Sequence, residues 1–270
     1  MKIALIQQHA TKDKSDNLTR GISALKEAAS NGAHLIAFPE LAFEYFLPQR
    51  PATQNVISLA EPIPGSTTDL FVKAAKELGI VIVLNLFERD NNKTYDTSPI
   101  IDADGKILGK TRMIHILEAP SFHEQGYYTP GDLGVPVFNT KAGRIGIAIC
   151  YDRHFPEYMR ALALNGADLV VVPQAGAVNE WTKGIFEAEL QIAAFQNGYF
   201  TALVNRVGKE EFVTFSGESF VTNPEGKVLA RAPREKDFIL YCDIDFTELE
   251  NCPARKHFLL DRRPNIYDTL

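Results

Sequence analysis

The chain contains two stretches that repeat the same order of residue types. Residues 31–40 (Asn-Gly-Ala-His-Leu-Ile-Ala-Phe-Pro-Glu) match residues 165–174 (Asn-Gly-Ala-Asp-Leu-Val-Val-Val-Pro-Gln) in character at nearly every position. Each stretch follows a helical pattern, and each helical pattern follows an apolar strand, at residues 2–7 and 144–150 respectively. A strand–helix–strand unit that occurs twice predicts a layered α/β architecture.

A second pair of stretches supports a duplication. Residues 98–110 align without gaps with residues 219–231, and both are typical of β-hairpins, with turns at Asp104-Gly105 and Glu225-Gly226. Two sheets that are each covered by helices on one face can bury their other faces against each other. We therefore predict a four-layer αββα sandwich built from two similar halves.

No Pro/Gly/Ser-rich linker divides the chain, so we expect a single domain over residues 1–270 with a C-terminal tail at about 250–270. The formal net charge of -6 argues against a nucleic-acid partner. The first apolar run is too short for a signal peptide, and no run approaches the roughly 18 residues of a membrane span. The three cysteines form no framework spacing, which indicates reduced thiols. We expect a cytoplasmic protein that binds neither membrane nor nucleic acid.

Cys150 is a candidate nucleophile. The apolar residues 145–149 predict a buried strand that ends at Cys150, and Pro156-Glu157 suits the first turn of a following helix. A thiol at a strand-to-helix turn lies near free backbone N–H groups, which favour the thiolate. The alternative is that Cys150 is a small buried hydrophobic residue.

Glu40 is a candidate general base. It directly follows the apolar strand expected at residues 35–38, and a carboxylate at the carboxyl end of a strand can line a crevice. The alternative is a helix-capping or solvated glutamate. Gln174 takes the corresponding place in the second half, so the two halves differ chemically at this point.

Three segments together resemble the signature segments of the nitrilase superfamily, the carbon–nitrogen hydrolases. They are Phe38-Pro39-Glu40, residues 109–115 (Gly-Lys-Thr-Arg-Met-Ile-His) and residues 150–153 (Cys-Tyr-Asp-Arg), in the order of the family. The resemblance implies a duplicated αββα fold and a Glu-Lys-Cys triad, with Glu40 as the base and Cys150 as the nucleophile. The chemistry that it implies requires no cofactor.

The third member of that triad departs from the family pattern. The family's second segment usually reads Arg-Lys-x-His, and its lysine falls on Met113. The lysine would favour the thiolate and hold the oxyanion, whereas methionine supplies neither charge nor donor. Losing one such donor costs on the order of 100- to 1,000-fold in rate. Either another donor replaces it, with His115 the nearest candidate, or the site is weakened. In an extended segment Lys110 and Arg112 point away from the face of Met113.

A second glutamate and a set of binding residues follow from the same resemblance. Residues 122–132 resemble the family stretch with a further active-site glutamate, so Glu124 would orient the substrate and the base; the alternative is a solvated loop residue. A backbone N–H near Tyr151 would help to hold the oxyanion. Arg153 and His154 can bind a substrate carboxylate, unless Arg153 forms a structural ion pair. The six histidines show no ligand-like spacing, so we expect no metal.

The substrate class is indicated by resemblances to particular branches. Residues 150–154 and 205–208 resemble enzymes that act on N-carbamoyl compounds, particularly β-ureidopropionases. Residues 205–208 and 262–264 also resemble N-carbamoylputrescine amidohydrolases. We therefore predict a cysteine-dependent amidohydrolase that releases ammonia from an N-carbamoyl amino acid or amine through a covalent Cys150 intermediate.

Two alternatives stay open. An ω-amidase or aliphatic amidase would use the same chemistry, and a catalytically silent binding protein would use the same scaffold, which Met113 favours. The expected partner is a small-molecule amide or ureide. The family resemblance also implies a homodimer or a higher homo-oligomer. The apolar residues 258–260 could supply an interface, and the alternative is that they pack on the chain's own core.

Overall fold

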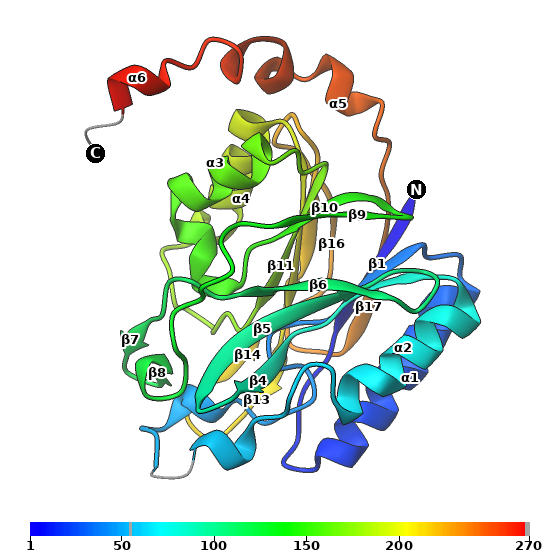
Figure 1. Cartoon of the computed structure of the whole chain (residues 1–270), viewed down its shortest axis with the longest axis vertical. Coiled ribbons are helices and arrows are strands. Elements are labelled where there is room, and N and C mark those ends of the chain that lie inside the picture. Colours follow the sequence, from blue (N-terminus) through cyan, green and yellow to red (C-terminus); the bar gives the residue numbers. More distant parts are fainter. Residues whose placement is uncertain (54–55, 268–270) are drawn as a thin grey trace.

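The fold is built from two mixed β-sheets that lie face to face between two pairs of helices. The computed structural model describes residues 1–53 and 56–267, and Figure 1 shows the arrangement. The strands of the first sheet run in the order β17 (Phe238–Asp243), β1 (Lys2–Gln7), β2 (Leu35–Ala37), β3 (Val81–Val83), β5 (Lys93–Ile101) and β4 (Leu86–Asp90), with β6 (Ile107–Arg112) also paired to β5. The second sheet runs β16 (Val228–Arg231), β15 (Phe220–Thr222), β12 (Phe200–Asn205), β11 (Leu169–Gln174), β10 (Gly143–Ile147) and β9 (Val137–Thr140).

Three apolar layers hold these elements together. The central layer joins the facing sides of the two sheets, with Leu5 and Leu35 from the first and Ile147 and Val171 from the second among its buried residues. A second layer lies between the first sheet and the helices α1 (Lys14–Ser30) and α2 (Ser66–Leu78). The third lies between the second sheet and the helices α3 (Pro156–Leu164) and α4 (Ile185–Asn197). The predicted four-layer αββα sandwich is confirmed.

The duplication predicted from the sequence extends to details of the hairpins. β5 pairs with β6, and β15 with β16, in antiparallel fashion. In both hairpins the register shifts at the same aligned place, between Ile100 and Ile101 in one and between Val221 and Thr222 in the other. A shared β-bulge at an aligned position is the kind of local feature that a duplication preserves.

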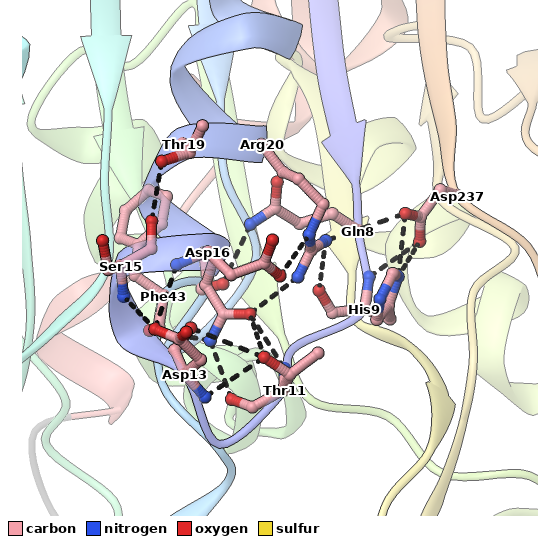
Figure 2. Close-up of polar contacts among 12 residues, drawn as sticks. Gln8, His9, Thr11, Asp13, Ser15, Asp16, Thr19, Arg20, Phe43 and Asp237 are labelled. Carbon is pink, nitrogen blue, oxygen red and sulfur yellow. Dashed lines mark hydrogen bonds and ion pairs between the residues drawn. The ribbon is translucent and has the colours of Figure 1, made fainter.

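The first helix begins where side chains satisfy its free N–H groups, as Figure 2 shows. The Asp13 side chain accepts hydrogen bonds from the backbone N–H groups of Ser15 and Asp16, so it is the N-cap of α1. Arg20, one turn further on, donates to the backbone oxygen of His9 and lies 3.8 Å from Asp237. These contacts fix the segment after β1 to the start of β17.

The remaining elements are short. They are β7 (Glu118–Ala119) paired with β8 (Phe122–His123), β13 (Val207–Lys209) paired with β14 (Thr214–Ser216), the single turns η1 (Leu47–Gln49), η2 (Val56–Leu59), η3 (Glu124–Gly126) and η4 (Cys150–His154), and the C-terminal α5 (Glu248–Asn251), η5 (Ala254–Phe258) and α6 (Pro264–Tyr267). The C-terminal segment runs past α3 and α4 (Figure 1), and Phe258 packs against Phe195 of α4 at 5.4 Å between ring centres. Residues 268–270 of the expected tail lie outside the described residues. Among the described helices, none is long and apolar enough to cross a membrane.

Candidate active site

Cys150 sits at a sharp turn after β10. The strand ends at Ile147, three residues earlier than the expected boundary, and Cys150 begins the single turn η4 with a positive φ of 43°. Such a backbone conformation is unusual for a residue with a side chain and points to a functional constraint. The helix α3 then begins at Pro156 as predicted. β10 approaches α3 closely enough that a Cβ on Gly146 would lie 2.9 Å from Leu162, which explains the small residues before the turn.

The surroundings of the Cys150 thiol favour its protonated form. Burial raises its pKa well above the usual range, and the carboxyl groups of Glu40 and Glu124 raise it further, while a hydrogen bond from the Ala175 backbone acts in the opposite direction. The Gln174 amide donates to Sγ at 3.4 Å. Burial and nearby negative charge therefore outweigh the effect of backbone N–H groups, which alone would favour the thiolate as the sequence predicts.

Glu40 lies in the loop after β2, and its side chain is fully buried. Its backbone is fastened by Arg206, whose guanidinium donates to the carbonyl oxygens of Glu40, Leu41 and Glu44. Arg206 is itself buried and paired with Glu210. Burial raises the pKa of the Glu40 carboxyl well above its usual range, and Asp96 and Glu124 raise it further.

Glu124 opens the single turn η3 and completes a triangle with the other two residues. Its Oε2 accepts from the Leu117 backbone N–H at 3.0 Å, whereas its buried Oε1 has no partner. Ligand atoms of Glu40, Glu124 and Cys150 all lie within 4.8 Å of one another. The three acid–base candidates thus come together from loops that are far apart in the sequence.

The sequence matches the family described as "Carbon-nitrogen hydrolase" over residues 2–254. It is 34% identical to the N-carbamoylputrescine amidase of Solanum lycopersicum, over 99% of this chain and 94% of that protein. It is 33% identical to the citrullinase of Francisella tularensis subsp. tularensis, over 100% and 98%. A crystal structure of a carbon-nitrogen hydrolase from Helicobacter pylori G27 superposes with a TM-score of 0.93 at 28% identity, over 99% and 97% of the two chains. The chain belongs to the carbon-nitrogen hydrolase family. It is therefore a carbon–nitrogen hydrolase, and the two relatives named above are an amidase and a citrullinase by name.

The residue at the position of the family's lysine, Met113, lies in the core of this hydrolase. Its side chain is fully buried in the same apolar cluster as Cys150, directly after β6. Lys110 and Arg112 turn to the other side, where both pair with Glu88, as the alternation of an extended strand predicts. His115, the nearest candidate to replace the lysine, has its Nδ1 2.7 Å from Asp152 and its ring stacked on Phe155, so its role as a donor stays a prediction.

Restoring a lysine at this position is expected to shift the pH dependence of Cys150. In a Met113→Lys variant the ammonium group would favour the ionised forms of the surrounding acids, so their pKa values fall. The rate of Cys150 alkylation by iodoacetamide falls as the pH is lowered, and the pH at which it falls should then be lower by about one to three units. Lys110→Met, which removes a lysine facing away from the site, should leave the profile where it is. If Met113→Lys left the pH profile unchanged, the side chain of residue 113 would not lie beside the acids around Cys150.

The expected binding residues follow Cys150 in η4. The Tyr151 ring packs against Phe155, and His154 pairs with Glu189 at 2.6 Å. Arg153 has a fully buried side chain that pairs with Glu189 at 3.0 Å, yet its Nε and Nη2 have no partner. A structural ion pair is therefore present, and two donors are left over for a ligand. Binding of substrate by these three residues stays a prediction.

Three polar residues of the site were not singled out from the sequence as functional. Gln174, the counterpart of Glu40 in the repeat, contacts the thiol. Asn85 and Asp96 lie behind Glu40: the Asn85 side chain accepts from the Leu41 backbone N–H and donates to the Asp96 carboxylate. The repeat offered one signal, since Asn205 occupies the place of Asn85 in the second half and accepts from the Gly176 N–H in a similar way.

Proposed function

We propose that the chain is a cysteine-dependent amidohydrolase that releases ammonia from an N-carbamoyl amine or amino acid. The observation that supports this most directly is the buried triangle of Glu40, Glu124 and Cys150. The names of two relatives, an N-carbamoylputrescine amidase and a citrullinase, agree with a ureido group as the target.

The reaction would proceed in two stages. In the first, the Cys150 thiol gives up its proton to Glu40, and Sγ attacks the ureido carbonyl carbon. Backbone N–H groups near Tyr151 are candidates to hold the negative oxygen that develops. The bond to the terminal nitrogen breaks, this nitrogen takes the proton, and ammonia leaves a carbamoyl thioester on Cys150.

In the second stage water attacks the thioester. Glu40 takes a proton from the water, the bond between carbon and Sγ breaks, and the thiol is regenerated. The resulting carbamate loses carbon dioxide to give the free amine. Glu124 would hold the substrate nitrogen and keep Glu40 in place, because its buried Oε1 is without a partner in this structure.

Substrate would reach the site from the side of Glu180. This residue lines a surface cavity of about 380 Å³ together with Trp181 and Phe186, and its charge also raises the pKa of Cys150. Phe186 stacks on the guanidinium of Arg153 at 4.9 Å. A carboxylate on the substrate could therefore meet Arg153 between the cavity and the thiol.

A substrate panel tests the proposal. We expect ammonia release from N-carbamoyl-β-alanine, N-carbamoylputrescine or citrulline to exceed release from a simple aliphatic amide. If the carboxylate-bearing compounds are preferred, Arg153→Met should weaken their turnover by about 10- to 100-fold and leave that of N-carbamoylputrescine largely unchanged. Preference for the aliphatic amide would favour an ω-amidase or aliphatic amidase instead. Silence toward every compound would contradict the proposal and favour a binding protein.

We also infer that the chain acts in the cytoplasm as a single-domain homo-oligomer. All three cysteines are free thiols, which suits a reducing compartment. Leu260 and Ile266 in the C-terminal segment are 74% and 66% exposed, so they offer apolar surface to a second copy.

A further inference from the structure

Asp96 is a buried carboxyl group behind Glu40 to which the proposed reaction gives no role. It lies on β5, fully shielded from solvent. The Asn85 side chain donates to its Oδ1, while Oδ2 has no N–H donor. The Met113 backbone N–H donates to the Asp96 backbone oxygen at 2.9 Å, so the residue at the lysine position lies directly across from Asp96.

Glu40 and Asp96 form a pair that requires a proton. If both groups were ionised, two carboxylates would face each other with no hydrogen-bond donor between them. The donor that interacts with the Glu40 carboxyl is the Cys150 thiol, whose proton is the one to be moved. With one proton between them, the two groups hydrogen-bond to each other. Asn85 stabilises negative charge on Asp96 alone, because its N–H group points at that residue. The proton therefore rests on Glu40 and the charge on Asp96.

In the described part of the chain, the positive side chain nearest this cluster is at its edge, where His115 pairs with Asp152. The ionisable groups that interact with Asp96 are Glu40 from the loop after β2, Glu124 from η3, Tyr128 just beyond it, and Asp152 from η4. Among the described residues, no lysine, arginine or histidine pairs with Glu40, Glu124 or Asp96. Several buried acids cannot all ionise in one closed site, and burial raises the pKa of Asp96 to about 7.

We propose that Asp96 is the proton acceptor of this site and that Glu40 relays the proton to it. When Cys150 is activated, the bond between Sγ and its hydrogen breaks and Glu40 takes that proton on one oxygen. Glu40 passes its own proton from the other oxygen to Oδ2 of Asp96. Negative charge moves from Asp96 to the sulfur, and Glu40 is neutral before and after the step.

The relay explains how a base can persist without the lysine. A protonated Glu40 carboxyl group among other acidic residues cannot accept a proton from the thiol unless it releases its own proton at the same time. An acceptor with a pKa near 7 is half ionised at neutral pH, where a general base is most effective. The inference rests on the proposed function only in taking Cys150 as the nucleophile.

The test measures the thiol directly, without a substrate. The rate of Cys150 alkylation by iodoacetamide would be followed by mass spectrometry from about pH 5 to about pH 9. Below about pH 7 Asp96 is protonated and cannot accept, so the native rate should fall there. Asp96→Asn keeps the shape but removes the acceptor. Burial, the largest cause of the raised Glu40 pKa, and the nearby Glu124 remain and keep Glu40 protonated, so alkylation should slow about 100-fold at neutral pH and the inflection near pH 7 should vanish. Asp102→Asn, a buried aspartate beyond the end of β5, should keep the native profile. A native profile in Asp96→Asn would overturn the proposal.

A second variant separates proton transfer from a structural role. In Asp96→Asn/Met113→Lys the new ammonium group allows Glu40 to ionise and accept the proton itself. Alkylation should recover by at least about ten-fold over Asp96→Asn. No recovery in a folded double variant would overturn the relay. If the native protein shows the expected profile but releases no ammonia from any compound of the panel, the proposed function fails while the relay stands.

Discussion

Replacement of Cys150 by alanine is expected to lower ammonia release from the preferred substrate by roughly 10,000-fold or more. The alanine leaves no atom that can form the carbamoyl intermediate, and neither Glu40 nor Glu124 can substitute as a nucleophile while buried and protonated. The measurement is the initial rate of ammonia release at saturating substrate, with intact-protein mass spectrometry to detect the adduct on Cys150.

Cys242→Ala is the matched control. Cys242 is also a buried thiol in the central apolar layer, but it lies on β17, away from the acid cluster. Its loss should cost stability alone, with ammonia release within about two-fold of the native rate. Comparable turnover by Cys150→Ala and the native chain would show that the nucleophile has been misassigned.

Replacement of Arg206 by methionine is expected to lower the free energy of unfolding by about 3–5 kcal/mol. The change leaves Glu210 as a buried charge without its partner and removes the donors to three carbonyl oxygens of the loop that bears Glu40. Chemical denaturation monitored by tyrosine and tryptophan fluorescence would measure the loss.

The control for this prediction is Arg144→Met. Arg144 makes an ion pair with Asp168 at 2.8 Å, but its side chain is 47% exposed. Because this pair is exposed, water solvates both charges when the pair is broken. The expected loss in the free energy of unfolding is therefore below about 1 kcal/mol. If both variants lost the same stability, the buried arrangement around Arg206 could not be what holds the Glu40 loop.

The layers of the fold could be predicted because they follow from short-range patterns. The first strand occupies residues 2–7 as expected, and both hairpins turn at the predicted Asp-Gly and Glu-Gly pairs. The repeat added the information that two such sheets face each other. The end of β10 was less predictable, because the chain leaves the strand before a sharp turn in which Cys150 has a positive φ, and no residue pattern marks that conformation.

By itself the sequence determined the architecture and the family, and it pointed to Glu40, Glu124 and Cys150 as the site residues, since these inferences depend on residue order. Only the tertiary structure decided which protonation states the site favours. In the sequence Asp96 is one polar residue within a strand, and in the fold Glu40 and Glu124 lie beside it. Burial and these two glutamates also outweigh the effect of backbone N–H groups on the Cys150 thiol. Burial and charge are sums over neighbours that are distant in sequence, so no local pattern reports them.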